Sequence, residues 1–273
     1  MPARLHRELI GTNVSQWLLF THGIYGSGGN WRSIARKIHE RRPEWGVVLV
    51  DLRQHGRSEP GDPPHTLEAC AEDVRALFDE LHGITVIAGH SFGGKVVLAT
   101  RALAPTTLRQ TWMFDASPSP RPGAETDPNN SVTRVLNLMR RLPKTWSKRD
   151  DFIAAITGAG EALPLAQWLA MNLVPETSGQ LALRLDLDAV GDMLQDYYAQ
   201  DLWPIALDPN LPGELDVVIA DQSTTLSAED RTRLAAAPPH VHVHHIDAGH
   251  WLHIEAPANV VALLTSALPT TLT

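Results

Sequence analysis

Residues 85–98 read Thr-Val-Ile-Ala-Gly-His-Ser-Phe-Gly-Gly-Lys-Val-Val-Leu, and this stretch decides the fold. Its β-branched apolar beginning predicts a buried strand, and its second half favours a helix. The tight connection between the two places Ser91 at the apex, with the small residues Gly89 and Gly93 on either side of it. A serine on such a turn projects its hydroxyl above a sheet, where it can act as a nucleophile.

The same stretch also matches most of a phosphate-binding loop, because Gly89 is followed after four residues by Gly94 and Lys95. That motif next requires Ser or Thr for magnesium, and Val96 stands there. Lys95 lies four residues after Ser91, so the pair lacks the Ser-x-x-Lys spacing of β-lactamase-type enzymes. We therefore disfavour a nucleotide ligand. We expect Lys95 either on the helix surface or in contact with the residues that form the site.

Composition narrows the class of protein. The 273 residues are 43% hydrophobic and 20% charged, which suits one large α/β domain with an insertion or two small domains. A net charge of −8 without a basic stripe argues against nucleic acid as a partner. The N-terminus shows no signal sequence and no apolar run approaches a membrane span, so we expect a cytoplasmic protein without a membrane partner.

Cysteine usage excludes two further possibilities. Cys70 is the only cysteine, so the chain has neither an intrachain disulfide nor a cysteine-based zinc site. We expect its side chain to serve as a small apolar packing residue.

Strand and helix patterns alternate along most of the chain, which predicts a mostly parallel sheet with helices on its faces. Besides the strand at 85–88 and the helix at 94–103, we expect strands near 5–10, 17–20, 47–52, 111–114, 215–220 and 240–246, and helices near 30–40, 66–82, 228–237 and 257–268.

The pattern changes between residues 121 and 212. Helical periods occur at 132–141, 148–157, 163–172 and 187–198, and no segment has a convincing strand pattern. We therefore predict an α/β core of residues 1–120 and 213–273, with a helical insertion of residues 121–212. Three tryptophans of the insertion either line a substrate pocket or pack its core, namely Trp146, Trp168 and Trp203.

A candidate base follows the last predicted strand. Residues 247–251 read Asp-Ala-Gly-His-Trp, so His250 lies at the end of that strand. Because the carboxyl ends of parallel strands gather at one edge of the sheet, we expect His250 close to Ser91. Trp251 then borders the acyl site.

Four motifs together resemble the α/β-hydrolase superfamily: residues 22–24 (His-Gly-Ile), 51–58, 89–94 and 249–251. The run Gly-His-Ser-Phe-Gly-Gly-Lys, with Asp-Ala-Ser-Pro at 115–118, resembles small serine esterases that include bacterial YbfF-type enzymes and mammalian ABHD11-type hydrolases. The resemblance implies a helical cap over the active site, no cofactor, and hydrolysis of carboxylic or thioester acyl groups.

The resemblance also suggests an oxyanion hole and a triad acid. The backbone amide of Phe92 starts the helix after Ser91, and that of Ile24 follows the His-Gly pair, so these two amides are the expected donors. We treat His22 as structural support. The superfamily usually places its acid after the strand at 215–220, where this chain has Ser223. We therefore favour Asp115 as the acid and keep Asp221 as the alternative.

A histidine-rich segment near the C-terminus allows two interpretations. His240, His242, His244 and His245 could form a metal tract or the polar outer face of an edge strand. We favour the edge strand and expect no metal.

These features predict a serine carboxylic-ester hydrolase with an α/β-hydrolase fold, acting through an acyl-enzyme on small to medium, fairly apolar acyl esters. The small-molecule ester is its expected partner, and the sequence predicts no oligomeric state. The alternatives are a thioesterase, a lactonase or a C–C bond hydrolase of the same fold, or a ligand-binding protein without turnover.

Overall fold

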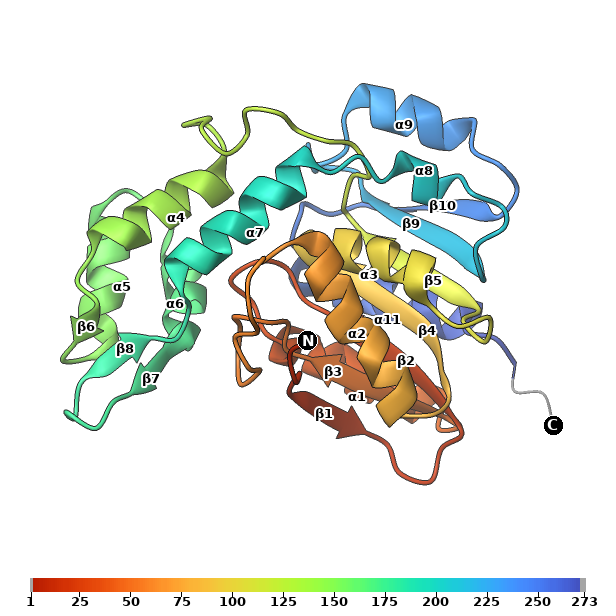
Figure 1. Ribbon diagram of the computed structural model, residues 1–273, viewed down its shortest axis with the longest axis horizontal. Coiled ribbons are helices and arrows are strands. Elements are labelled where there is room, and N and C mark those ends of the chain that lie inside the picture. The colour runs from red at the N-terminus through yellow and green to blue at the C-terminus, as the bar shows by residue number, and fades with distance from the viewer. Residues whose placement is uncertain (1, 271–273) are drawn as a thin grey trace.

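The computed structural model describes residues 2–270, and a seven-stranded sheet runs through its centre (Figure 1). Only the pairing of the first two strands of this order is antiparallel, as predicted for a mostly parallel sheet. Each strand falls on a predicted one, and their spatial order is β1 (Arg7–Ile10), β3 (Trp45–Val50), β2 (Gln16–Thr21), β4 (Ile84–His90), β5 (Gln110–Phe114), β9 (Glu214–Ala220) and β10 (Val241–Ile246).

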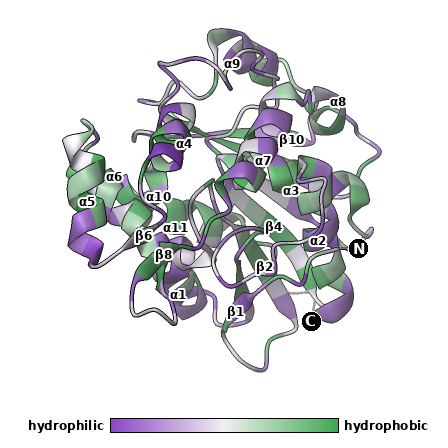
Figure 2. Ribbon diagram, turned by 60° about the vertical axis from the view of Figure 1, so that its left-hand side comes forward, coloured by the Kyte–Doolittle hydropathy of each residue, from purple (hydrophilic) through white to green (hydrophobic). Residues whose placement is uncertain are grey.

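Helices cover both faces of the sheet. On one face lie α2 (Leu67–Glu80) and α3 (Phe92–Leu103), and on the other lie α1 (Arg32–Arg41) and α11 (Pro257–Ala267). The central strands are apolar along their length because helices bury both of their sides (Figure 2). Cys70 of α2 is fully buried against the core, and this burial raises the pKa of its thiol. Across residues 2–270, no helix is both long and apolar enough to cross a bilayer.

Strand register brings the site residues together. His90 of β4 pairs with Phe114 of β5, so the next residues, Ser91 and Asp115, leave neighbouring strands side by side. On the far side of β9, Ile246 of β10 pairs with Ala220. The loop that carries His250 therefore starts from the same edge of the sheet.

Between β5 and β9 the chain leaves the sheet and forms a separate layer, at the left in Figure 1. The predicted helical periods are present, and the expectation of no strand is wrong. Three short strands pair antiparallel in this layer, and segments of two or three residues are too short to show alternation in a sequence. Its elements are α4 (Ser131–Arg141), β6 (Thr145–Trp146), α5 (Arg149–Gly158), α6 (Leu163–Leu169), β7 (Leu173–Pro175), β8 (Leu181–Leu183) and α7 (Leu187–Ala199). The short helix α8 (Trp203–Ala206) follows, where the returning chain packs against α3 of the core.

Lys95 fixes both connections of this layer to the core. Its side chain is buried, so it is not on the helix surface, one of the two places expected for it. The ammonium group donates to the carbonyls of Ser119, at 2.8 Å, and of Tyr197 and Gln200, both at 2.9 Å. Burial lowers the pKa of Lys95 to about 8. One side chain near the start of α3 therefore holds the outgoing and the returning chain.

Candidate active site

The turn around Ser91 has the strained geometry of a nucleophile-bearing turn. Ser91 has φ +54° and ψ −117°, and α3 begins at the next residue. A Cβ atom on Gly93 would lie 2.5 Å from the carbonyl oxygen of His22, and one on Gly89 would overlap the backbone of Gly93. Only glycine fits at these two positions, and this close packing holds Ser91 at the apex.

Three side chains form a continuous chain of hydrogen bonds. The Oγ of Ser91 lies 3.1 Å from Nε2 of His250, and Nδ1 of His250 lies 2.6 Å from Oδ2 of Asp115. Because the carboxylate can only accept, Nδ1 carries the proton and Nε2 is left to accept from the serine hydroxyl. Asp115 is fully buried, whereas the imidazole is 30% exposed. The arrangement can transfer a proton from Ser91 to His250 while a carboxylate orients the ring.

The Asp115 carboxylate has two further donors. The hydroxyl of Ser223 donates to Oδ2 at 2.6 Å, and the amide of Ala220 approaches Oδ1 at 3.3 Å. Thr225 Oγ1 lies 3.0 Å from the Ser223 hydroxyl and 3.1 Å from Nδ1 of His250. The sequence indicated Ser223 only as the residue at the usual acid position, and it did not point to Thr225.

The alternative acid lies elsewhere. Oδ1 of Asp221 is 2.6 Å from Nδ1 of His245, on the neighbouring strand β10, and Asp221 makes no hydrogen bond to His250 in the described residues. The structure therefore brings Asp115 to His250 and leaves Asp221 in a surface pair.

His90 supports the backbone of the His250 loop. Its Nε2 donates to the carbonyl oxygen of His250 at 2.8 Å, and its ring lies between the rings of His250 and His253, with centroids 4.6 and 4.7 Å away. Desolvation lowers the pKa of His90 well below its usual value and that of His253 to about 4. Both rings are therefore neutral near pH 7 and add no positive charge beside His250.

Two backbone amides beside Ser91 are available to a ligand. Within residues 2–270, the amides of Ile24 and Phe92 donate no hydrogen bond. Phe92 is the first residue of α3, where a helix has no internal acceptor for an amide. A Cβ atom on Gly23 would lie 3.5 Å from Cβ of Ser91, so the chain entering Ile24 passes directly against the serine. The expected oxyanion donors thus flank Ser91.

In the loop after Ile24, every polar atom of Tyr25 makes a hydrogen bond. This residue has φ +64°, and its amide donates to Nε2 of His55 at 3.1 Å. Its carbonyl accepts from Asn172 at 2.8 Å, and its hydroxyl donates to the carbonyl of Val132 at 2.9 Å. Nε2 of His22 likewise accepts from the amide of Leu52 at 3.0 Å, as expected for structural support. Core and insertion together hold the backbone next to Ile24.

The candidate pocket tryptophans separate into two groups. Trp251 lies beside His250, and Trp168 packs edge-on against Trp251 with centroids 4.9 Å apart. Trp146 instead packs against Phe152 inside the insertion. Trp203 donates to Ser119 at 2.7 Å at the junction with the core. The structure therefore brings two of the four tryptophans near the triad, and packing accounts for the other two.

The histidine-rich segment forms β10, the edge strand of the sheet. Its side chains face carboxylates of the β9 segment: His242 lies 3.2 Å from Glu214, and His244 lies 2.8 Å from Asp216. In residues 2–270, no group of three or more His, Cys, Asp or Glu side chains could hold a metal ion.

Comparison with known proteins assigns this chain to a family. The model of the alpha/beta hydrolase family matches residues 18–263, so the chain belongs to the alpha/beta hydrolase family. Among curated relatives, the sn-1-specific diacylglycerol lipase ABHD11 of Danio rerio is 28% identical over 94% of this chain and 80% of its own length. Esterase YbfF of Escherichia coli is 26% identical over 89% of each chain.

Solved structures agree with this placement of the fold. A structure described as a marine microorganism esterase superimposes with a TM-score of 0.83 at 22% identity, over 97% of this chain and all of that one. At this identity the likeness concerns the fold alone. The family and the named relatives support a hydrolase, as the sequence motifs indicated.

Proposed function

We propose that this protein is a serine esterase that hydrolyses small to medium, fairly apolar acyl esters through an acyl-enzyme. One observation carries the proposal: Ser91, His250 and Asp115 are linked by hydrogen bonds of 3.1 and 2.6 Å, beside two amides that find no acceptor among residues 2–270. Curated relatives named as esterases and lipases support the same reaction class.

In the proposed reaction, Ser91 Oγ attacks the ester carbonyl carbon while Nε2 of His250 takes the hydroxyl proton. The amides of Ile24 and Phe92 hold the negative oxygen of the tetrahedral intermediate. The imidazolium then gives its proton to the leaving alcohol, and the acyl group stays on Ser91. Water attacks the acyl-enzyme, assisted by the same His250, and releases the acid. The insertion, residues 121–212, acts as a cap over this site.

Hydrolysis of p-nitrophenyl esters of graded acyl length tests the proposal. We expect steady turnover by the native chain, and loss of at least about a thousandfold in kcat for Ser91→Ala with unchanged thermal unfolding. A Ser117→Ala variant controls for removal of a hydroxyl that lies outside the proposed triad. Absence of turnover by the native protein on every ester would favour ligand binding without catalysis. Full activity of Ser91→Ala would refute the nucleophile.

A further inference from the structure

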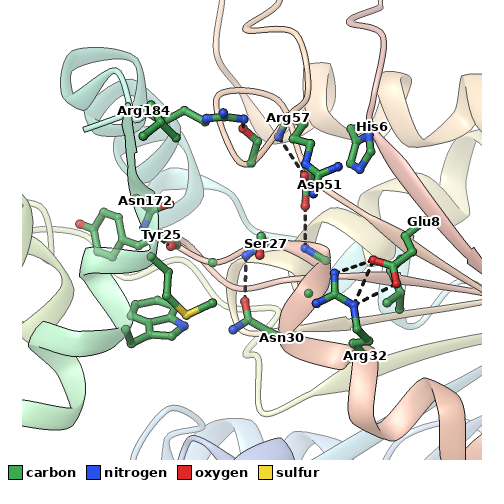
Figure 3. A pocket seen from close by; sticks show the side chains of 18 residues that line it. His6, Glu8, Tyr25, Ser27, Asn30, Arg32, Asp51, Arg57, Asn172 and Arg184 are labelled. Atoms are coloured by element: carbon green, nitrogen blue, oxygen red, sulfur yellow. Dashed lines mark hydrogen bonds and ion pairs between the residues drawn. The ribbon is translucent and has the colours of Figure 1, made fainter. Parts of the chain in front are cut away.

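A cavity lies beside the proposed active site. It has a volume of about 300 Å³ and lies between the core and the insertion, and none of the three triad side chains lines it (Figure 3). Its core wall contains the loop of residues 25–30 with the side chains of Arg32 and Arg57. Its other wall comes from the insertion and includes Trp168 and Arg184. We call this cavity the interface cleft.

The interface cleft adjoins the reacting groups at two places. Tyr25, which lines it, directly follows Ile24, whose amide is a proposed oxyanion donor. Trp168, which also lines it, packs against Trp251 beside His250. A substrate whose carbonyl oxygen is bound by the Ile24 amide can therefore direct one substituent past Tyr25 and Trp168.

Both carboxylates that line the interface cleft already have hydrogen-bond donors. The carboxylate of Glu8 accepts two hydrogen bonds from the guanidinium of Arg32, at 2.9 and 2.6 Å. The carboxylate of Asp51 accepts from the amides of Gly28 and Arg57, at 2.8 and 2.9 Å.

This leaves two guanidinium groups without a carboxylate partner. In the described part of the chain, neither Arg57 nor Arg184 has a carboxylate oxygen within 4.0 Å of its side-chain nitrogens. Arg184 donates to the carbonyl of Gly56, which positions it across the boundary between insertion and core. Three arginines therefore face two carboxylates here, although the chain as a whole carries a net charge of −8.

Three apolar residues line the insertion side of the interface cleft, next to Asn172 and Arg184. They are Trp168, Met171 and Val174, and Met171 is 63% exposed. An exposed methionine next to a tryptophan offers an adaptable surface to an apolar chain. The two walls together suit a ligand with an apolar segment and an anionic group.

We propose that the interface cleft binds an anionic group, a carboxylate or a phosphate, that a short apolar spacer connects to the ester hydrolysed at Ser91. Arg57 from the core and Arg184 from the insertion bind this group, because planar guanidinium groups recognise both kinds of oxyanion through paired hydrogen bonds. The inference rests on the proposed esterase function and adds a class of substrate to it.

Matched esters test the preference for charge. Monomethyl adipate against methyl hexanoate places the charge on the acyl side, and 4-acetoxybutanoate against butyl acetate places a carboxylate on the alcohol side. The ester 3-acetoxypropyl phosphate, also against butyl acetate, replaces that carboxylate with a phosphate. Proton release measures kcat/KM for each. We expect at least one charged ester to exceed its neutral partner, and the best arm identifies the side and the anion. No preference for charge in any arm would overturn the proposal.

Arginine variants assign the preference to the interface cleft. Arg57→Gln and Arg184→Gln should each lower kcat/KM of the preferred charged ester by about tenfold, mainly through KM, and change the neutral ester by less than twofold. Arg41→Gln, on an exposed residue outside the cleft, removes the same charge and should leave the ratio unchanged. Equal losses on charged and neutral esters, or an effect of Arg41→Gln as large as that of Arg57→Gln, would refute a role for the cleft.

Binding without turnover separates this inference from the proposed function. Calorimetric titration of Ser91→Ala with each charged ester and with its neutral partner measures affinity when no ester is cleaved. Tighter binding of a charged ester than of its neutral partner, lost on adding Arg57→Gln, supports the cleft even if the esterase proposal fails. Equal binding within every pair contradicts it even if the native enzyme hydrolyses neutral esters.

Discussion

The Asp115 carboxylate illustrates how single residues define the site. It is fully buried, and donors from His250, Ser223 and Ala220 surround it. A buried charge is costly unless several hydrogen bonds compensate it, and these donors come from two different strand ends. Ser223 thus follows β9, and its hydroxyl donates to the carboxylate of Asp115, which follows β5.

At this scale we predict that Asp115→Asn lowers kcat on p-nitrophenyl esters by roughly 10³- to 10⁴-fold. The amide cannot accept the Nδ1 proton as the carboxylate does, so His250 loses the tautomer that accepts from Ser91. Asp221→Asn is the matched control and should stay within about twofold of the native protein, because Asp221 pairs with the exposed side chain of His245. A larger loss for Asp221→Asn would reverse the assignment.

The sequence could predict some of these residues and not others. Ser91 stands in a motif whose glycines indicate a tight turn. His250 follows the last strand of the regular alternation of strands and helices. The choice between Asp115 and Asp221 depends on side-chain direction at two adjacent strand ends, which no spacing records. Asp221 turns to His245 because β9 and β10 pair in one particular register.

At the scale of elements, the connections of the insertion depend on α3. Lys95 lies one turn after Ser91 and donates to carbonyls that are 24, 102 and 105 residues later in the chain. Its position four residues after the nucleophile suggested no such partner, because all three acceptors are backbone carbonyls of distant segments, which no sequence motif marks. Tyr197, one of these residues, also packs against Phe92, with centroids 5.5 Å apart.

We predict that Lys95→Met lowers the free energy of unfolding by about 3 kcal/mol, because three carbonyls lose their donor in a buried region. Urea unfolding at pH 7 measures this change, and proteolytic cleavage within residues 121–212 should become faster. Lys37→Met, on the exposed side of α1, is the control and should leave the unfolding midpoint within experimental error. An unchanged midpoint for Lys95→Met would show that water replaces the ammonium group without cost.

At the scale of the whole molecule, the sheet gathers residues that are far apart in sequence. Ser91 and His250 are separated by 159 positions, and Asp115 and His250 by 135. The alternation of strands and helices predicted this arrangement, since parallel strands end at a common edge. The same edge collects four buried histidines whose pKa values burial lowers, namely His22, His55, His90 and His253.

These histidines predict acid sensitivity of the whole fold. Their pKa values in the folded chain lie below the unfolded value of about 6.5, reaching about 4 for His253 and about 3 for His55. Between these limits the unfolded chain binds more protons, so the free energy of unfolding falls as the pH decreases below about 6.5. Above about pH 6.5 these histidines are neutral in both the folded and the unfolded chain, so their contribution to the free energy of unfolding no longer changes with pH.

Urea unfolding between pH 7.5 and pH 4.5 measures this effect. His253→Gln should reduce the pH dependence, since His253 alone accounts for up to about 3 kcal/mol at pH values below 4. His82→Gln, on an exposed ring, is the matched control and should leave the slope as it is. A slope that stays the same in His253→Gln would mean that His253 gains no proton on unfolding.

The burial of Cys70 has a practical consequence for observing the insertion in solution. A thiol without exposed surface and with a raised pKa does not react with maleimide reagents while the chain is folded. The native chain therefore already serves as a background for fluorescent labelling, with no cysteine to remove. A cysteine introduced at Leu163, which is 52% exposed at the start of α6, would carry the only dye and would report whether the insertion moves when an ester binds.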